Sequence, residues 1–438
     1  MTQMISFIVQ PGGYLRGEAR VPGDKSISHR SIMLGSLAEG VTHVSGFLEG
    51  EDALATLRTF QAMGVQIEGP VDGKVTIHGV GLNGLQAPKD PLYLGNSGTS
   101  MRLLCGLLAG QSFDTVLTGD ESLSGRPMKR VIDPLEKMGA VIESADQGRA
   151  PLTIRGKAKL KGIHYDMPIA SAQVKSCLLL AGLYADGTTS VTEPAPTRDH
   201  TERMLTGFNY PVEKKSNQAS VARNGKLTAT EIDVPSDISS AAFFLVGASI
   251  APSSDLTLKH VGVNPTRTGV IDILKLMGAN IELSNQRTIG GEPVADIRVQ
   301  SAELKGIAIP EELVALAIDE FPVIFVAAAC AQGETVLTGA KELRVKESDR
   351  IQVMADGLQV LGVDAQPTED GMVIQGGEIG GGTVISHHDH RIAMSFAIAG
   401  LRATESIVIE NCANVNTSFP GFVSLASELG LNIMSEEK

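Results

Sequence analysis

The chain alternates between apolar stretches rich in Ala and Leu and short segments in which polar and apolar residues alternate. One pattern, a helix end followed by a glycine turn and a β-like strand, occurs six times, at residues 34–46, 107–119, 180–193, 245–258, 326–339 and 396–411. A glycine ends a helix readily because it tolerates the left-handed backbone conformation, and Thr and Val then favour a strand. Each copy therefore predicts a helix, a turn and a strand in that order.

A second pattern follows each copy of the first. It is an amphipathic helix closed by Met-Gly or Leu-Gly and then a short strand, at residues 56–68, 131–143, 269–282, 357–365 and 425–433; a further copy at 202–214 lacks the closing pair. Apolar residues at i, i+3 and i+4 give these helices one buried face. Six ordered pairs argue against a chance similarity of generic units. They predict an α/β fold of two lobes with three copies each, and a crossing between the lobes near residues 238–242.

Composition narrows the class of protein. The 438 residues carry a formal net charge of −13 without a long basic run, which disfavours nucleic acids and anionic membranes as partners. The longest apolar stretches, such as 323–331, are shorter than the roughly 20 residues of a membrane span. The N-terminus lacks the features of a signal peptide. The four cysteines are scattered beside apolar residues, so we expect buried, reduced thiols in a cytoplasmic protein.

Polar clusters interrupt the apolar pattern just before the predicted helices. They read PGDKSISHRS, LGNSGTSMRLL, SLSGRPMKR, MPIASAQVKS, PTRDHTERM, AIDEFP, ELRVKESDRI and HHDHRIAM. Helix amides beside a cation suit a phosphate, and a guanidinium suits phosphate or carboxylate. Lys346 and Arg350 are four residues apart, a spacing that places both on one face of a helix. Each cluster alone is also compatible with solvated caps or a surface helix. Their recurrence at equivalent points predicts one anion-binding cleft between the lobes.

Two other kinds of site are disfavoured. The histidines of HHDHRIAM match no common zinc spacing, and no cysteine motif completes them, so we expect no metal. Neither GxxxxGK[ST] nor GxGxxG after a strand is present, which argues against nucleotide binding.

Taken in order, PGDKSISHR, GNSGTSMR, RPM, SAQVKS, RDHTE, RVKESDR and DHRIAM resemble the 5-enolpyruvylshikimate-3-phosphate (EPSP) synthase family, in its class II branch. The resemblance implies an inside-out, two-domain α/β barrel of six βαβαββ repeats, three per domain, with the active site in the interdomain cleft. The lower domain would comprise residues 1–22 and 241–438, and the upper domain 23–240. It also implies a monomer that needs no cofactor. The implied reaction transfers the enolpyruvyl group of phosphoenolpyruvate to the 5-hydroxyl of shikimate 3-phosphate and releases phosphate.

The resemblance also assigns roles to individual residues. Asp319 corresponds to the acceptor of the 5-hydroxyl proton, Glu347 to the acid that protonates the enol methylene, and Lys25 to the lysine that touches both substrates. The implied shikimate 3-phosphate site consists of Lys25, Ser26, Arg30, Ser171, Ala172, Gln173, Thr197, Arg198, Asp319 and Lys346. The implied phosphoenolpyruvate site consists of Lys25, Gly98, Arg126, Gln173, Arg350 and Arg391.

The chain departs from the family pattern at one point, and two rival functions stay open. Some members carry a Lys two residues before the final Phe-Pro, where this chain reads NVNTSFP with Asn416 and Thr417. The nearest rival is the related transferase that uses UDP-N-acetylglucosamine and carries a loop cysteine, which GDESLSGRPM lacks. A non-catalytic anion-binding protein is the other rival, and Asp319 and Glu347 argue against it because binding alone needs no acids.

Overall fold

The sixfold helix–strand pattern is present in the computed structural model, which describes residues 5–437. The first helix and strand of each copy are α1 (Lys25–Leu37) and β3 (Glu39–Ser45), α3 (Gly98–Ala109) and β7 (Thr115–Thr118), α6 (Ala172–Gly182) and β11 (Thr188–Thr192), α8 (Ile238–Ile250) and β15 (Asp255–Gly262), α10 (Phe321–Ala329) and β18 (Glu334–Leu337), and α12 (His390–Ala399) and β22 (Ile407–Glu410). The predicted helix–turn–strand order is confirmed in all six copies.

The second pattern is confirmed as well. Its helices and strands are α2 (Glu51–Ala62) and β4 (Gln66–Val71), α5 (Lys129–Lys137) and β8 (Val141–Ala145), α7 (His200–Gly207) and β12 (Glu213–Lys215), α9 (Gly269–Leu276) and β16 (Asn280–Ile289), α11 (Arg350–Val360) and β19 (Asp364–Pro367), and α13 (Phe422–Leu429) and β23 (Leu431–Glu437). The remaining elements are β1 (Ile5–Gly13), β2 (Arg16–Ala19), β5 (Lys74–Val80), β6 (Leu92–Tyr93), α4 (Glu121–Ser124), β9 (Arg149–Arg155), β10 (His164–Asp166), β13 (Gln218–Ala222), β14 (Glu231–Asp233), β17 (Glu292–Gln300), β20 (Met372–Gln375) and β21 (Gly382–Ile385).

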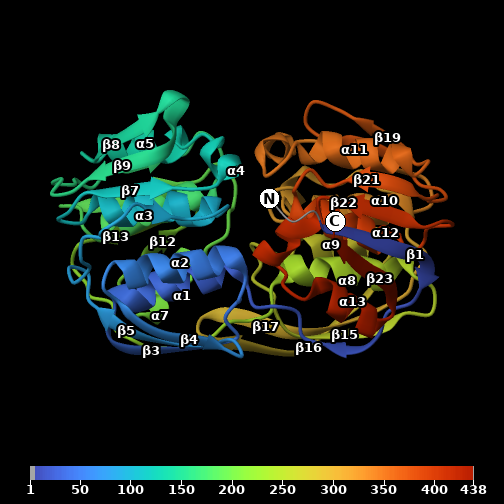
Figure 1. The fold of residues 1–438 in the computed structure, drawn as a ribbon, viewed down its shortest axis with the longest axis horizontal. Helices are drawn as coiled ribbons and strands as arrows, with labels where there is room; N and C mark the ends of the chain where they lie inside the picture. Colours follow the sequence, from blue (N-terminus) through green and yellow to red (C-terminus); the bar gives the residue numbers. More distant parts are fainter. Residues whose placement is uncertain (1–4, 438) are drawn as a thin grey trace. The chain divides into compact units, whose positions relative to one another are not determined.

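The strands form small mixed sheets that repeat one arrangement. In the sheet ordered β14-β3-β5-β4, the first pair is parallel and the other two pairs are antiparallel. The same order of directions recurs in β10-β11-β13-β12, β6-β7-β9-β8 and β21-β22-β1-β23. Figure 1 shows α1 and α2 covering the face of the β3–β5 sheet. The repeated sequence pattern therefore corresponds to a repeated structural unit.

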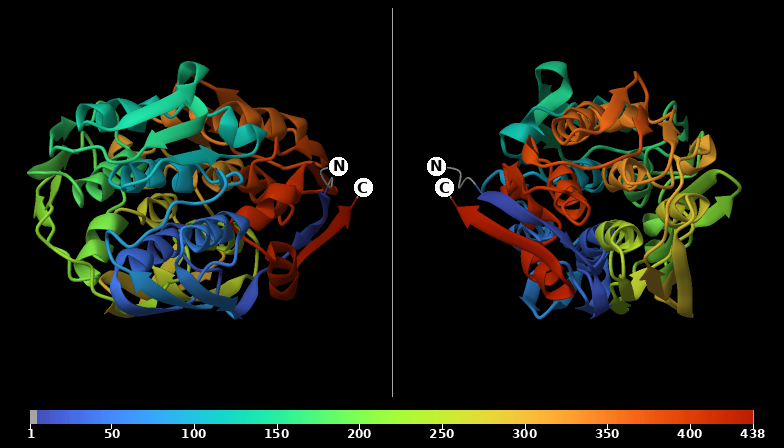
Figure 2. Two further views of the ribbon diagram at one scale, coloured as in Figure 1. Left: turned by 60° about the vertical axis from the view of Figure 1, so that its left-hand side comes forward. Right: turned by 90° about the vertical axis from the view of Figure 1, so that its right-hand side faces the viewer.

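The chain divides into two compact units. Unit 1 contains residues up to 22, 235–287 and 293 onward, and unit 2 contains 23–234 and 288–292. The predicted limit after residue 240 falls inside α8, whereas the units divide at 234/235, ahead of the residue Asp237 that caps α8. Each unit has its own hydrophobic core. In unit 1, β1 lies between β22 and β23, so the first and the last strand within residues 5–437 run side by side (Figure 2).

The first helix of each copy is more deeply buried than the second. All residues of α8 and α10 are buried, and α1, α3, α6 and α12 are buried along most of their length. A helix that is apolar on every side belongs in a core, and these helices pack on one another within each unit. None of the helices within residues 5–437 is long and apolar enough to cross a membrane.

Candidate functional site

In unit 2, three predicted site residues are the first residues of three buried helices. Lys25 begins α1, Gly98 begins α3 and Ala172 begins α6, and α3 packs against both α1 and α6. Side-chain caps close all three helix starts: Asp24 accepts from the amide of Ile27, and Ser97 and Ser171 cap α3 and α6 in the same way. Backbone N–H groups at such helix starts attract anions. This confirms the prediction that the polar clusters stand at helix N-termini.

Two cations of unit 2 are held at α1. The ammonium of Lys25 forms an ion pair with the nearly buried carboxylate of Asp52, at the start of α2. The guanidinium of Arg30 is buried and donates to Thr201 Oγ1 at 2.7 Å, to Ser176 Oγ at 2.8 Å and to the carbonyl of Ser26 at 2.9 Å. Burial lowers the pKa of Arg30 to about 10, so the residue stays positively charged at neutral pH.

Three of the predicted phosphoenolpyruvate ligands, Gly98, Arg126 and Gln173, lie near the start of α3. Arg102 donates to Gln173 Oε1 at 2.6 Å, and Gln173 Nε2 donates to Thr99 Oγ1 at 3.0 Å. A Cβ added to Gly98 would lie 3.1 Å from Arg102 Nη1 and 3.2 Å from Arg126 Nη1. Gly98 therefore faces two guanidinium groups, and its missing side chain leaves room beside them.

The loop that carries Thr197 and Arg198 is tied to α6. The hydroxyl of Thr197 donates to Glu193 Oε2, and Lys175 Nζ donates to Glu193 Oε1 at 3.0 Å. Lys175 also pairs with Glu202 Oε1 at 2.9 Å. Because the hydroxyl proton of Thr197 is already donated to Glu193, this hydrogen bond has to break before the hydroxyl can donate to a phosphate.

In unit 1 the guanidinium of Arg350 gathers three carboxylates. Its Nη2 lies 2.6 Å from Glu347 Oε2, its Nη1 3.3 Å from Asp319 Oδ1 and its Nε 2.8 Å from Asp389 Oδ2. Arg350 and Asp389 are 1 % and 0 % exposed, whereas Asp319 and Glu347 keep 14 % and 26 % of their side chains accessible. Two accessible acids thus share one buried cation.

Asp389 links the second arginine to this cluster. It caps α12 by accepting from the amide of Arg391 at 2.9 Å and also accepts from the hydroxyl of Ser348 at 3.0 Å. Burial is the largest single influence and disfavours its charged form, but the charge and hydrogen bond of Arg350 together with the charge of His390 lower the pKa of Asp389. The Arg391 side chain lies 3.9 Å from the buried carboxylate of Glu320.

The predicted shared helix face of Lys346 and Arg350 is wrong. Helix α11 begins only at Arg350, after the cap Asp349, and Lys346 follows a short 3-10 turn (Lys341–Val345) with extended backbone. Asp349 caps α11 by accepting from the amide of Gln352, and it also pairs with Arg344 of the preceding turn at 2.6 Å. Lys346 still reaches the cluster, because its Nζ lies 3.6 Å from Asp319 Oδ1.

Sequence reasoning missed several partners of the predicted residues. Asp52 pairs with Lys25, Arg102 with Gln173, and Asp389 with Arg350, and none of the three was among the candidates. Arg102 carried a usable signal, because it follows Gly98 by one helical turn. No feature of the sequence indicated Asp52, because its partner, Lys25, belongs to a different helix.

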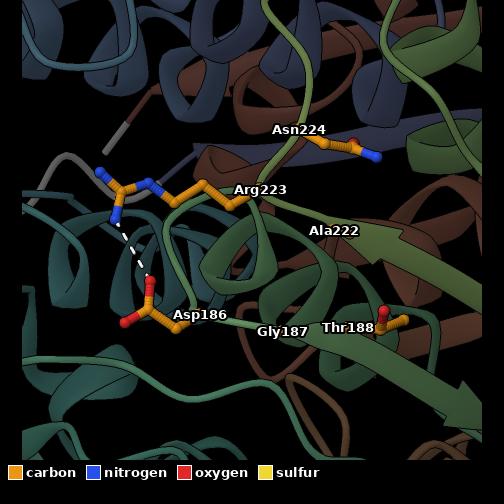
Figure 3. A pocket seen from close by; sticks show the side chains of 6 residues that line it. All are labelled: Asp186, Gly187, Thr188, Ala222, Arg223 and Asn224. Carbon is orange, nitrogen blue, oxygen red and sulfur yellow. Dashed lines mark ion pairs between the residues drawn. The ribbon is translucent and has the colours of Figure 1, made fainter.

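Other features lie outside the two clusters. Thr417 is buried and donates to the carbonyl of Asn414, while Asn416 is exposed. No cluster of three or more His, Cys, Asp or Glu suited to a metal occurs within residues 5–437. A surface concavity lies at the opposite end of α6 from Ser171, where Arg223 pairs with Asp186 at 3.6 Å (Figure 3). It contains no predicted site residue.

The four cysteines are free thiols, three of them buried and Cys330 partly buried. Burial raises the pKa of Cys105, Cys330 and Cys412 to about 12 and raises that of Cys177 as well. The thiolate is the reactive form. We therefore expect a small alkylating reagent at pH 7.5 to leave activity largely intact over the time in which it consumes a free model thiol. Stoichiometric inactivation that substrate prevents would contradict this expectation.

Comparison with known proteins places these clusters in a family. The family model described as EPSP synthase (3-phosphoshikimate 1-carboxyvinyltransferase) matches residues 9–425. The chain belongs to the EPSP synthase family. A 3-phosphoshikimate 1-carboxyvinyltransferase of Alkalilimnicola ehrlichii is 71% identical over 428 residues, which is 98% of this chain and 96% of that protein. One of Methylococcus capsulatus is 68% identical and covers 98% of each chain.

Solved structures agree with this membership. The EPSP synthase of Acinetobacter baumannii superposes with a TM-score of 0.90 at 60% identity, over 99% of this chain and all of the other. The mixed α/β fold predicted for the EPSP synthase family is thereby confirmed. Membership also makes the chain a transferase of the 3-phosphoshikimate 1-carboxyvinyltransferase type.

Proposed function

We propose that the chain transfers the enolpyruvyl group of phosphoenolpyruvate to the 5-hydroxyl of shikimate 3-phosphate and releases phosphate. The observation that carries the proposal is the Arg350 cluster, in which two accessible acids, Asp319 and Glu347, share one buried guanidinium. A cation alone binds anions. Two acids held beside it provide a proton acceptor and a proton donor, which the transfer requires.

We propose that the two clusters divide the substrates as the family resemblance implies. In unit 2, Arg30, Arg198 and the start of α6 at Ser171 and Ala172 bind shikimate 3-phosphate, with Ser26, Gln173 and Thr197 lining that site. Gly98, Arg126 and Gln173 of unit 2, with Arg350 and Arg391 of unit 1, bind phosphoenolpyruvate. Lys25 contacts both substrates, and Lys346 contacts shikimate 3-phosphate. Guanidinium groups suit this task because they hold planar carboxylates and phosphates with paired hydrogen bonds.

The proposed chemistry has two steps. The 5-hydroxyl oxygen attacks C2 of phosphoenolpyruvate while Asp319 accepts its proton and Glu347 donates a proton to C3, which gives a tetrahedral intermediate. Glu347 then takes a proton back from C3 as phosphate departs from C2, which forms the enolpyruvyl ether. Arginines around the phosphate and the carboxylate stabilise the negative charge that develops on them.

Further proposals follow from family membership. Units 1 and 2 would be the two domains, each an inside-out arrangement of three repeats, and the reaction would take place in the cleft between them. We also propose a cytoplasmic monomer that acts without a cofactor.

Phosphate release tests the function. The purified chain is incubated with phosphoenolpyruvate alone, with added shikimate 3-phosphate, and with added UDP-N-acetylglucosamine. We expect release only with shikimate 3-phosphate. Release with the sugar nucleotide instead would favour the sister transferase, and no release with either acceptor would favour a binding protein.

The substitution Gly98→Ala tests the phosphoenolpyruvate site. Its Cβ would approach two guanidinium groups to 3.1 and 3.2 Å, and the resulting shift is expected to raise KM for phosphoenolpyruvate about 10-fold with little change for shikimate 3-phosphate. Gly377→Ala is the matched control, because a Cβ there meets no atom within 4 Å. An unchanged KM for phosphoenolpyruvate in Gly98→Ala would remove Gly98 from the site.

A further inference from the structure

A buried lysine stands at the centre of three elements of unit 2. Lys175 lies in the second turn of α6, and its side chain is 0 % exposed. Its ammonium lies 3.0 Å from Glu193 Oε1, in the loop after β11, and 2.9 Å from Glu202 Oε1, in α7. A buried ammonium is tolerated only when carboxylates or other acceptors compensate its charge. Lys175 therefore joins α6, the loop and α7 at one point.

Glu202 connects Lys175 to a second buried cation, Arg30. Glu202 is buried and raises the pKa of Arg30, whose Nε donates to the neighbouring Thr201. Asp24, Glu292 and Arg198 also act on Arg30, so Glu202 is one of several charges around that guanidinium. Removing a carboxylate from such a buried group leaves a cation less well compensated away from water, and this holds its members in place.

The loop residue next to Arg198 is held at two atoms. Thr197 donates its hydroxyl proton to Glu193 Oε2, and its carbonyl oxygen accepts from Lys175 Nζ at 3.5 Å. The hydroxyl proton is therefore directed at Glu193. Arg198 follows directly in the chain, and its charge acts on Arg30, since it lowers the pKa of that residue. Because Thr197 is held in this way, the position of the Arg198 backbone is fixed as well.

We propose that Lys175 and Glu193 are positioning residues that fix Thr197 and so direct the guanidinium of Arg198 at the phosphate of shikimate 3-phosphate. This inference rests on the proposed function, in which Arg198 binds that phosphate. In this proposal, Thr197 anchors the loop through its hydrogen bond to Glu193. The pair acts through Arg198 and touches no substrate.

The test uses substitutions that keep the fold. Glu193→Gln preserves the size of the side chain and leaves Lys175 paired with Glu202. Thr197→Val removes the hydroxyl, and Thr197→Ser retains it. We expect Glu193→Gln and Thr197→Val to raise the Kd for shikimate 3-phosphate about 10-fold, measured by titration calorimetry, and Thr197→Ser to lose less affinity than Thr197→Val because it keeps the hydroxyl that donates to Glu193. The KM for phosphoenolpyruvate should change less than about 2-fold.

A double-mutant cycle separates positioning from a general structural role. In the Arg198→Ala background, adding Glu193→Gln should change the Kd by less than about 2-fold, because the residue through which Glu193 acts is gone. Asp186→Asn, at the far end of α6, is the matched control and should bind normally. Melting temperatures of all variants are recorded alongside.

Each outcome decides the question. Equal losses of affinity in both backgrounds would overturn the inference, because they show a role independent of Arg198. Unchanged or tighter binding by Glu193→Gln would also overturn it. If the unmodified chain itself fails to bind shikimate 3-phosphate, the proposed function fails instead.

Discussion

Asp319→Asn and Glu347→Gln are each expected to lower kcat at least about 100-fold while shikimate 3-phosphate still binds. Both acids lie on the guanidinium of Arg350, at 3.3 and 2.6 Å, and both remain accessible. An amide keeps the shape of the side chain but neither accepts nor donates the proton that the reaction moves. Steady-state kinetics gives kcat, and calorimetric titration gives the Kd for shikimate 3-phosphate.

Two exposed residues of unit 1 provide controls of the same chemistry. Asp356, on the surface of α11, takes the Asp→Asn change, and Glu312, in an exposed turn, takes the Glu→Gln change. Both control variants should keep normal kcat. Near-normal turnover in Asp319→Asn and Glu347→Gln would remove these acids from the mechanism, and loss of shikimate 3-phosphate binding would assign them to recognition instead.

Arg350→Met is expected to abolish measurable activity and to lower the free energy of unfolding of unit 1 by about 3–5 kcal/mol at pH 8. The substitution leaves the fully buried carboxylate of Asp389 without the cation that lies 2.8 Å away. Without that cation, burial dominates and raises the pKa of Asp389. Differential calorimetry at several pH values measures the loss.

The pH dependence of this loss has a defined sign. In the unmodified chain the folded pKa of Asp389 is lowered, so its contribution to stability is complete above the unfolded value near 4 and disappears as the pH falls through the folded value. In Arg350→Met the buried acid is stabilised by protonation. The difference between the two proteins should therefore shrink as the pH falls from 8 to 5.

Arg298→Met is the matched control for this prediction. Arg298 binds Asp255 through two hydrogen bonds of 2.9 and 2.7 Å, but the pair is exposed at the surface of unit 1. Water and ions screen such a pair, so its loss should change stability little. A loss in Arg350→Met no greater than that in Arg298→Met would show that burial of Asp389 carries no penalty.

The local elements of the fold were predictable, and their assembly was not. The helix–turn–strand order depends on glycine turns and apolar spacing within about 15 residues, so the sequence reveals it in all six copies. Sheet partners are set by contacts between distant segments. For example, β2 pairs with β15, and β1 pairs with β22 and β23. No local sequence pattern predicts these pairings.

In the candidate site, too, local features were predictable from the sequence and contacts between distant residues were not. Motifs at helix starts located Lys25, Gly98 and Arg391, because capping and anion binding leave a local signature. The network that holds Arg198 was hidden, because Lys175 and Glu193 meet only in the fold. The prediction that Lys346 and Arg350 share a helix was wrong because Asp349 caps α11, which therefore begins at Arg350.

The position of β1 has a consequence for synthesis on the ribosome. This strand is made before unit 2, whereas both of its neighbours, β22 and β23, are made after unit 2. Unit 2 is almost complete once residue 234 has been made, so it can fold while unit 1 still lacks most of its core. Until β22 and β23 have been made, β1 lacks its partners at both edges, and its apolar residues Phe7 and Val9, which are buried in the folded unit, stay uncovered. Throughout this interval β1 is open to pairing with a strand of another chain.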